Sequence, residues 1–133
     1  MSTSTAVLET SLATIQRPTA GLVEIHIKAD VTVNLQGILE IFTKLDGQGW
    51  AGPAKLLVVF PEMPVDFDLP VMSKDHFEGR PAGPNGTTVA LAVPDPRTLG
   101  FIELHFAYFP AVVSMRIFTT EVEARAWLAP LPD

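Results

Sequence analysis

The side chains best suited to chemistry lie in one proline-rich stretch, residues 61–86. Within it, four carboxylates and an imidazole follow at Asp66, Asp68, Asp75, His76 and Glu78. Oxygen and imidazole groups of this kind are ligands for divalent cations. Their spacing matches no established loop, however, and the glycine that a calcium loop needs is missing. We therefore interpret the segment as a solvated acidic loop and expect neither a bound metal nor another cofactor.

Ser73, together with Asp75 and His76, supplies the residue types of a hydrolytic triad. A working triad needs a strained turn at the nucleophile and an oxyanion hole. The Gly-x-Ser-x-Gly pattern of such a turn is absent, and three residues so close in the chain rarely converge on one atom. We expect no catalytic residues and a protein that is not an enzyme. The alternative is an enzyme that uses the acidic loop 62–78, with or without a metal.

The same stretch also carries much apolar side-chain area, at Met63, Phe67, Leu69, Val71, Met72 and Phe77. These side chains either fold back over the core or line a pocket, and the prolines keep the loop stiff enough to hold the shape of a pocket. In the second case the candidate ligand-binding residues combine apolar and polar members of the loop. They are Met63, Asp66, Phe67, Asp68, Met72, Ser73, His76 and Phe77.

The loop begins where a predicted strand ends. Residues 55–60 form a nearly continuous apolar run between Pro53 and Pro61, which is typical of a strand covered on both faces in an α/β sheet. Residues 87–93 have the same character, so both strands are predicted to be interior. Ligands of open α/β sheets lie outside the carboxyl ends of their strands. The strand 55–60 therefore points to the loop 61–86 as the best candidate site.

The remaining segments complete a single α/β domain over residues 10–129, preceded by a flexible N-terminus at 1–9. Further strands are predicted at 12–17, 21–28 and 112–118, a short helix at 71–78, and longer helices after caps at Asn34, Asp95 and Thr120. This order predicts a mixed sheet of four to five strands packed with three to four helices. The hairpin formed by the first two strands is expected toward an edge of the sheet.

Alternation divides the strand 21–28 into an apolar face and a polar face. The polar face carries Leu22, Glu24, His26 and Lys28. His26 is therefore expected to be a half-exposed surface residue. Trp127, in the last helix, is expected to close over the sheet as a core residue.

The helix predicted for 96–109 has two apolar stripes. The first, which suffices to dock the helix on a sheet, consists of Leu99, Ile102, Phe106 and Phe109. The second, on a different face, consists of Phe101, His105 and Tyr108. We expect this second stripe to be the interface of a homodimer, because a twofold contact is the commonest way to cover an aromatic patch. The alternative is that the loop 61–86 covers it within one chain.

The composition argues against several classes of partner. The 133 residues carry a net charge of −6 and a pI near 4.9, which argues against nucleic acids and anionic membrane surfaces. There is no cysteine, so disulfides and thiolate chemistry are excluded. No apolar run approaches the roughly 20 residues of a spanning helix, and no signal peptide is recognised. We therefore expect a cytoplasmic protein without membrane insertion.

The C-terminal part of the chain resembles a known family. A strand that ends in Phe118-Thr119, then an acidic turn and an Ala-x-Ala-Trp-Leu helix at 124–128, is similar to the C-terminal signature of STAS-like (SpoIIAA-like) proteins. Further matching segments, in order over residues 10–128, are 31–34, 56–59, 89–93 and the helix that ends in Phe109-Pro110. The resemblance implies a four- or five-stranded mixed sheet with helices, as in STAS domains and the related lipid-binding SEC14-type domains.

Phosphorylated members of that family carry an Asp-Ser-Ser-Gly-like turn after the central strand. This sequence has Pro64-Val-Asp-Phe-Asp-Leu-Pro70 there, so the phosphorylation switch is not carried over. We expect a bacterial, non-enzymatic STAS-like domain that acts through protein–protein contact or by binding a small apolar ligand. A second alternative, beside the enzyme, is a lipid-carrier-like binding domain, by analogy of fold alone. A cavity behind residues 61–78 would favour a binding protein.

Overall fold

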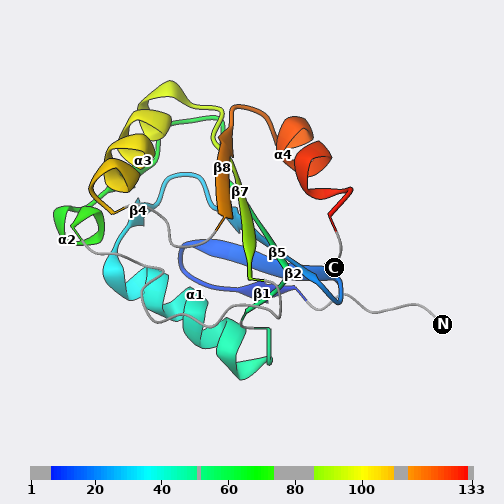
Figure 1. Ribbon diagram of the computed structural model, residues 1–133. Helices are drawn as coiled ribbons and strands as arrows, with labels where there is room; N and C mark the ends of the chain where they lie inside the picture. The colour runs from blue at the N-terminus through cyan, green and yellow to red at the C-terminus, as the bar shows by residue number, and fades with distance from the viewer. Residues whose placement is uncertain (1–6, 51, 74–85, 110–113, 132–133) are drawn as a thin grey trace.

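The computed structural model describes residues 7–50, 52–73, 86–109 and 114–131 (Figure 1). The main sheet consists of β1 (Leu8–Glu9), β2 (Ala13–Thr19), β3 (Leu22–Ile27), β5 (Lys55–Val59), β7 (Thr88–Ala92) and β8 (Ser114–Phe118). Two short strands, β4 (Thr32–Val33) and β6 (Asp66–Phe67), pair separately. The helices are α1 (Leu35–Gly47), α2 (Leu69–Met72), α3 (Pro96–Tyr108) and α4 (Glu121–Leu128). The architecture is therefore α/β, as the sequence predicts.

The strands of the main sheet lie in the order β1-β2-β3-β5-β7-β8. The first three are antiparallel, and β3, β5, β7 and β8 are parallel. The two strands predicted to be interior, β5 and β7, have a neighbour on each side. All five predicted strands are present, but the predicted count of four to five was too low. The sixth strand, β1, lies within the N-terminal stretch expected to be flexible, and two residues are too few to show a periodic pattern.

Side chains alternate between two differently covered faces of the main sheet. On one face, Ile25, Leu56 and Leu91 belong to the larger core cluster, which also includes residues of α1, α2 and α3. On the other face, Leu57 and the two alanines of β7 pack against α4. Figure 1 shows α1 and α3 on one side of the strands and α4 on the other. In the described part of the chain, no helix combines the length and apolarity needed to cross a membrane.

Each of the three longer helices begins at the cap that the sequence predicts. The Asn34 side chain accepts a hydrogen bond from the amide of Gly37 at 2.7 Å, and the Asp95 carboxylate accepts one from the amide of Thr98 at 2.9 Å. Thr120 accepts one from the amide of Glu123 at 3.2 Å. These bonds satisfy amides that have no partner within the helix itself.

Helix α1 approaches the start of β2 through a buried glycine. A Cβ atom added to Gly37 would collide with the side chain of Leu12, which is itself buried. One turn later, the Glu40 carboxylate accepts a hydrogen bond from the Ser11 hydroxyl at 2.7 Å. The two contacts join α1 to the same point of the chain, just before β2.

Helix α4 is joined to the sheet by charged groups as well as by apolar packing. Arg125 donates to both carboxylate oxygens of Glu24 on β3, at 2.7 and 2.9 Å, and to Glu121 on its own helix at 2.6 Å. The Lys55 ammonium donates to the carbonyls of Leu128 and Leu131 at the end of α4, at 3.5 and 3.2 Å. The helix is thus held at its middle and at its C-terminal end.

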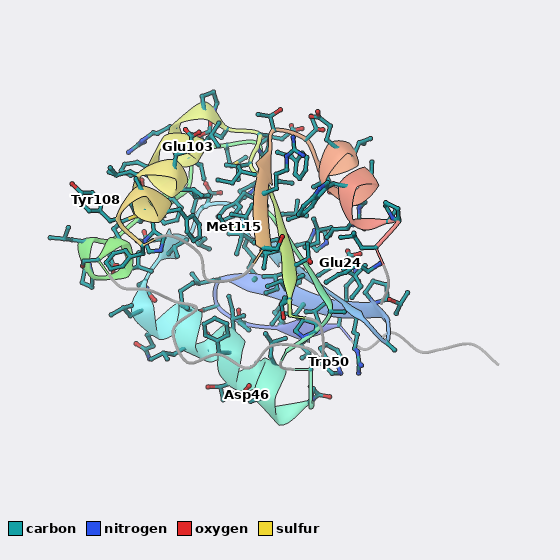
Figure 2. The ribbon with its side chains drawn as sticks, in the orientation of Figure 1. Glu24, Asp46, Trp50, Glu103, Tyr108 and Met115 are labelled. Carbon is teal, nitrogen blue, oxygen red and sulfur yellow. The ribbon has the colours of Figure 1, made fainter. Side chains whose placement is uncertain are left out.

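The polar face of β3 is covered, and Trp127 is less buried than expected. The face of β3 that carries Glu24 is not a solvent face: Glu24 is only 3 % exposed, because α4 covers it. Figure 2 shows Glu24 between the sheet and α4. His26 is half-exposed as expected, and its Nε2 lies 3.1 Å from the Glu24 carboxylate. Trp127 is only partly buried, with its ring 5.7 Å from that of Phe118 at the border of the smaller cluster.

We predict that Gly37→Ala destabilises the protein by about 1–3 kcal/mol, because the added methyl group collides with Leu12. Helix propensity alone would predict an increase in stability, since alanine is favoured over glycine in a helix interior. The matched control is Gly100→Ala in α3, where a Cβ would meet nothing within 4 Å. That variant should gain about 0.5–1 kcal/mol. Urea denaturation measures both changes in the free energy of unfolding. A change in the same direction for both variants would refute the close approach of Gly37 to Leu12.

We also predict a pH-dependent contribution from Glu24. The pKa of Glu24 is lowered from 4.5 to about 2, and the largest cause is the hydrogen bonding from Arg125. Because the folded-state pKa is the lower one, the ionised group stabilises the fold fully above pH 4.5. This contribution is lost as the pH falls from 4.5 toward about 2. Glu24→Gln should therefore lower the free energy of unfolding by about 2 kcal/mol at neutral pH.

The measurement is urea denaturation of Glu24→Gln and wild type across this pH range. The difference between the two proteins should shrink as the solution is acidified. Glu103→Gln changes an exposed carboxylate of α3 (Figure 2) and serves as the control, with a small difference at every pH. A Glu24→Gln difference that stays constant down to about pH 2 would contradict the ion pair.

Candidate functional site

An apolar cavity of about 160 Å³ lies between the main sheet and the helices on its larger face. The sheet side of its wall comes from β3, β5 and β7, at Ile25, Ile27, Leu56, Val58 and Leu91, and from Phe60 directly after β5. The helix side comes from α1 and α3, at Ile38, Ile41, Phe42, Ile102, His105 and Phe106. Val33 of β4 contributes as well. The cavity therefore lies within the larger core cluster and not in a surface groove of polar residues.

The loop after β5 closes one side of this cavity. Phe67 at the end of β6, together with Val71 and Met72 of α2, belongs to the cavity wall. This is the region to which the strand 55–60 points, and an apolar cavity lies beside it.

Local hydrogen bonds explain why the loop takes this course. β6 pairs with β4 in parallel, and the Asp68 amide donates to the Val33 carbonyl at 3.1 Å. The Asp68 carboxylate then caps α2 by accepting from the Val71 amide at 3.0 Å. Earlier in the loop, the Val65 amide donates to the hydroxyl of Thr98 in α3 at 3.1 Å. The loop is thus attached both to the strand before α1 and to the first turn of α3.

His105 brings the only titratable side chain to the described wall of the cavity. It is 8 % exposed, and its Nδ1 lies 3.1 Å from the Met72 carbonyl, a distance at which an Nδ1–H donates to that oxygen. Its ring meets Phe106 edge to face, with centroids 4.9 Å apart. The atoms exposed at the cavity surface are apolar, so this histidine presents ring carbon to the cavity and not a polar atom.

The predicted ligand-binding residues fall into three groups. Phe67 and Met72 line the cavity. Four others lie in the described part of the loop but not in the wall: Met63, Asp66, Asp68 and Ser73. The last two, His76 and Phe77, lie outside the described residues. The structure therefore brings two of the eight predicted residues into the cavity wall and places four others outside it.

The polar residues of the loop have structural partners instead. Asp66 is exposed and lies 3.5 Å from Arg97 of α3, and Asp68 caps α2. The Ser73 hydroxyl donates to the Leu69 carbonyl at 2.8 Å, at the end of α2. Asp75, His76 and Glu78, the other members of the acidic and triad patterns, lie outside the described residues. Among the residues that the structure describes, no group of three or more His, Asp or Glu could hold a metal ion.

The three residues predicted for a homodimer interface do not share one surface. Phe101 packs against Phe67, with ring centroids 5.8 Å apart. His105 is buried against α2. Tyr108 is 75 % exposed at the end of α3, and Figure 2 shows it pointing away from the sheet. The loop thus covers most of the second stripe within one chain, which was the alternative that the sequence left open. The homodimer itself stays a prediction.

Sequence patterns identify several residues of the cavity wall as core and not as a site. Alternation in β3 and helical spacing in α1 identify Ile25, Ile27, Ile38 and Phe42 as inward-facing residues. No sequence pattern indicates that such residues leave space between them, because a cavity depends on how volumes match in three dimensions.

Three comparisons with known proteins add no relative. No family model matches the chain, and no curated protein and no solved structure shows significant similarity to it. The resemblance to STAS-like proteins therefore stays a prediction that depends on the quoted segments alone.

Proposed function

We propose that this protein binds a small apolar ligand in the cavity between the main sheet and the helices α1, α2 and α3. The observation that carries the proposal is the cavity of about 160 Å³ with its apolar wall. Protein interiors are close-packed, and voids larger than a water molecule are few in any domain.

The energetic argument supports the same proposal. Cavities in protein cores lower stability by about 24 cal/mol for each Å³. The space of about 160 Å³ leaves the side chains around it without some of their dispersion contacts. A ligand of matching shape would restore the missing dispersion contacts. Binding would then raise the stability of the folded protein in proportion to ligand concentration.

The placement of the polar loop residues supports binding over catalysis. Asp68 and Ser73 bond to the backbone of α2, and Asp66 faces Arg97 on the outside of α3. None of the three lies in the cavity wall. A general base has to lie within hydrogen-bond reach of the substrate atom that it serves. A ligand in the cavity would not meet these groups.

Membership of the STAS-like family belongs to the proposal as well. It is supported by the C-terminal stretch, in which β8 ends at Phe118 and Thr120 caps α4 through the amide of Glu123. The strand, cap and helix follow one another as the resemblance implies. The mixed parallel and antiparallel sheet is compatible with it.

A second role, protein contact, is supported by a separate observation. Leu104 and Tyr108 lie one turn apart on α3 and are both exposed, and Leu69 is exposed on α2, which bonds to α3 through His105. We propose that the chain forms a homodimer through Leu69, Leu104 and Tyr108. This surface replaces the stripe centred on Phe101 and His105, which the loop already covers.

The test of the ligand site uses xenon, which enters apolar cavities without needing a polar partner. Two-dimensional amide NMR spectra of the full chain under xenon pressure should show shifts at β3, β5 and α3. Val58→Phe, which places a ring in the cavity, should abolish them. Val122→Phe, the same change at an exposed position of α4, should leave them intact. Absence of shifts in the wild type would refute the proposed ligand site.

The test of the homodimer is light scattering on the wild type and on Leu104→Asp/Tyr108→Asp. A dimer in the wild type and a monomer in the double variant are expected, because two carboxylates in an apolar contact are strongly unfavourable. Val122→Asp on α4 is the control and should remain dimeric. A wild type that is monomeric at high micromolar concentration contradicts this role.

A further inference from the structure

We infer that the cavity takes a single neutral ring, aromatic or alicyclic, of about six to eight non-hydrogen atoms. This inference rests on the proposed function and adds the chemical class of the ligand. It is carried by three properties of the cavity: its volume, the absence of charge in its described wall, and the rings that form part of that wall.

The volume sets the size of the ligand. An apolar cavity of roughly 150 Å³ in another protein accommodates benzene, and the cavity described here measures about 160 Å³. One ring with one or two small substituents fits such a space. A fused pair of rings, a nucleotide or the acyl chain of a membrane lipid is too large. The size therefore separates this ligand from the lipid of a SEC14-type carrier.

The chemistry of the wall sets the charge of the ligand. Among the residues described in the wall there is no lysine, arginine, aspartate or glutamate. The single histidine, His105, has its Nδ1 within hydrogen-bond distance of the Met72 carbonyl, and the described wall residues expose no polar atom at the cavity surface. A carboxylate or phosphate would lose its hydration on entry without gaining a partner, which is strongly unfavourable. The ligand is therefore neutral.

The rings of the wall favour a ring over a chain. Phe42, Phe60, Phe67 and Phe106 contribute to the wall, and Phe60 and Phe67 lie with centroids 6.5 Å apart and planes at 43°. Aromatic rings gain additional stabilisation from tilted and edge-to-face neighbours at such separations. A rigid ring also loses fewer rotational states on binding than a linear hydrocarbon of equal carbon number. Both effects favour a ring over a chain.

The experiment is a set of NMR titrations of the full chain with toluene, methylcyclohexane, n-heptane, benzoate and naphthalene. Toluene and methylcyclohexane should shift the same resonances as xenon. n-Heptane should bind about tenfold more weakly, and benzoate and naphthalene at least about a hundredfold more weakly. Benzoate binding as tightly as toluene overturns the neutral class, and naphthalene binding as tightly overturns the size. n-Heptane binding as tightly as toluene overturns the preference for a ring.

Two variants test whether the ligands bind in the cavity. Phe67→Ala removes a ring from the wall and should admit naphthalene, while toluene binds more weakly than to the wild type. Val122→Phe, at an exposed site, should leave the order of ligands unchanged. Xenon separates the two hypotheses. If xenon shifts the cavity resonances and no ring compound does, only the proposed ligand class is wrong. If xenon does not shift them either, both the ligand class and the ligand site are refuted.

Discussion

Water has to be excluded from both faces of β5 and β7, and this constraint shapes the rest of the molecule. The two strands are interior and parallel, and after Lys55 and Thr88 at their starts their side chains are apolar in both directions. The faces are covered by unequal means. On one, Ala90 and Ala92 are small enough for a single short helix, α4, to cover them. On the other, branched residues meet three helices and a loop, and their bulk leaves the cavity between them.

Covering the smaller face requires more than apolar packing, since α4 has only eight residues. Its few buried side chains are supplemented by Arg125, which reaches Glu24 on β3, and by Lys55, which reaches the last carbonyls of the helix. The charged groups are all hydrogen-bonded, as buried charges must be. Alternation within β3 distinguishes a polar face that carries Glu24, but the pattern of one strand does not reveal that a helix covers this face.

The predictable parts of the fold are those with a local physical cause. Continuous apolar runs fix β5 and β7, alternation fixes β3, and the side chains of Asn34, Asp95 and Thr120 fix the helix starts. Where tertiary packing decides, the sequence fails. Leu39 has the spacing of the buried stripe of α1 but is 56 % exposed, and Ile41 is buried in its place. The buried residues of α1 are Gly37, Ile41 and Leu45, and Gly37 lies close against Leu12, a contact that helical spacing does not reveal.

The candidate site divides in the same way. The sequence points to the segment after β5 as a candidate site, and Phe67 and Met72 of this segment line the cavity. The chemistry of the site could not be predicted. Carboxylates such as those of the loop are common ligand-binding groups, but here they bond to the backbone and to Arg97. Asp68 illustrates the point: a carboxylate that caps a four-residue helix has the same sequence signature as one that binds a ligand.

The distance along the chain between Glu24 and Arg125 has a consequence for the order of folding. The two residues are 101 positions apart, whereas β2 and β3 pair as a local hairpin. Local pairs form before distant ones, because closing a long loop is entropically unfavourable. We therefore expect the Glu24 carboxylate to remain hydrated on an open face while the parallel strands assemble. During synthesis on the ribosome, that face stays uncovered until the segment containing α4 has emerged, so the last helix completes the fold.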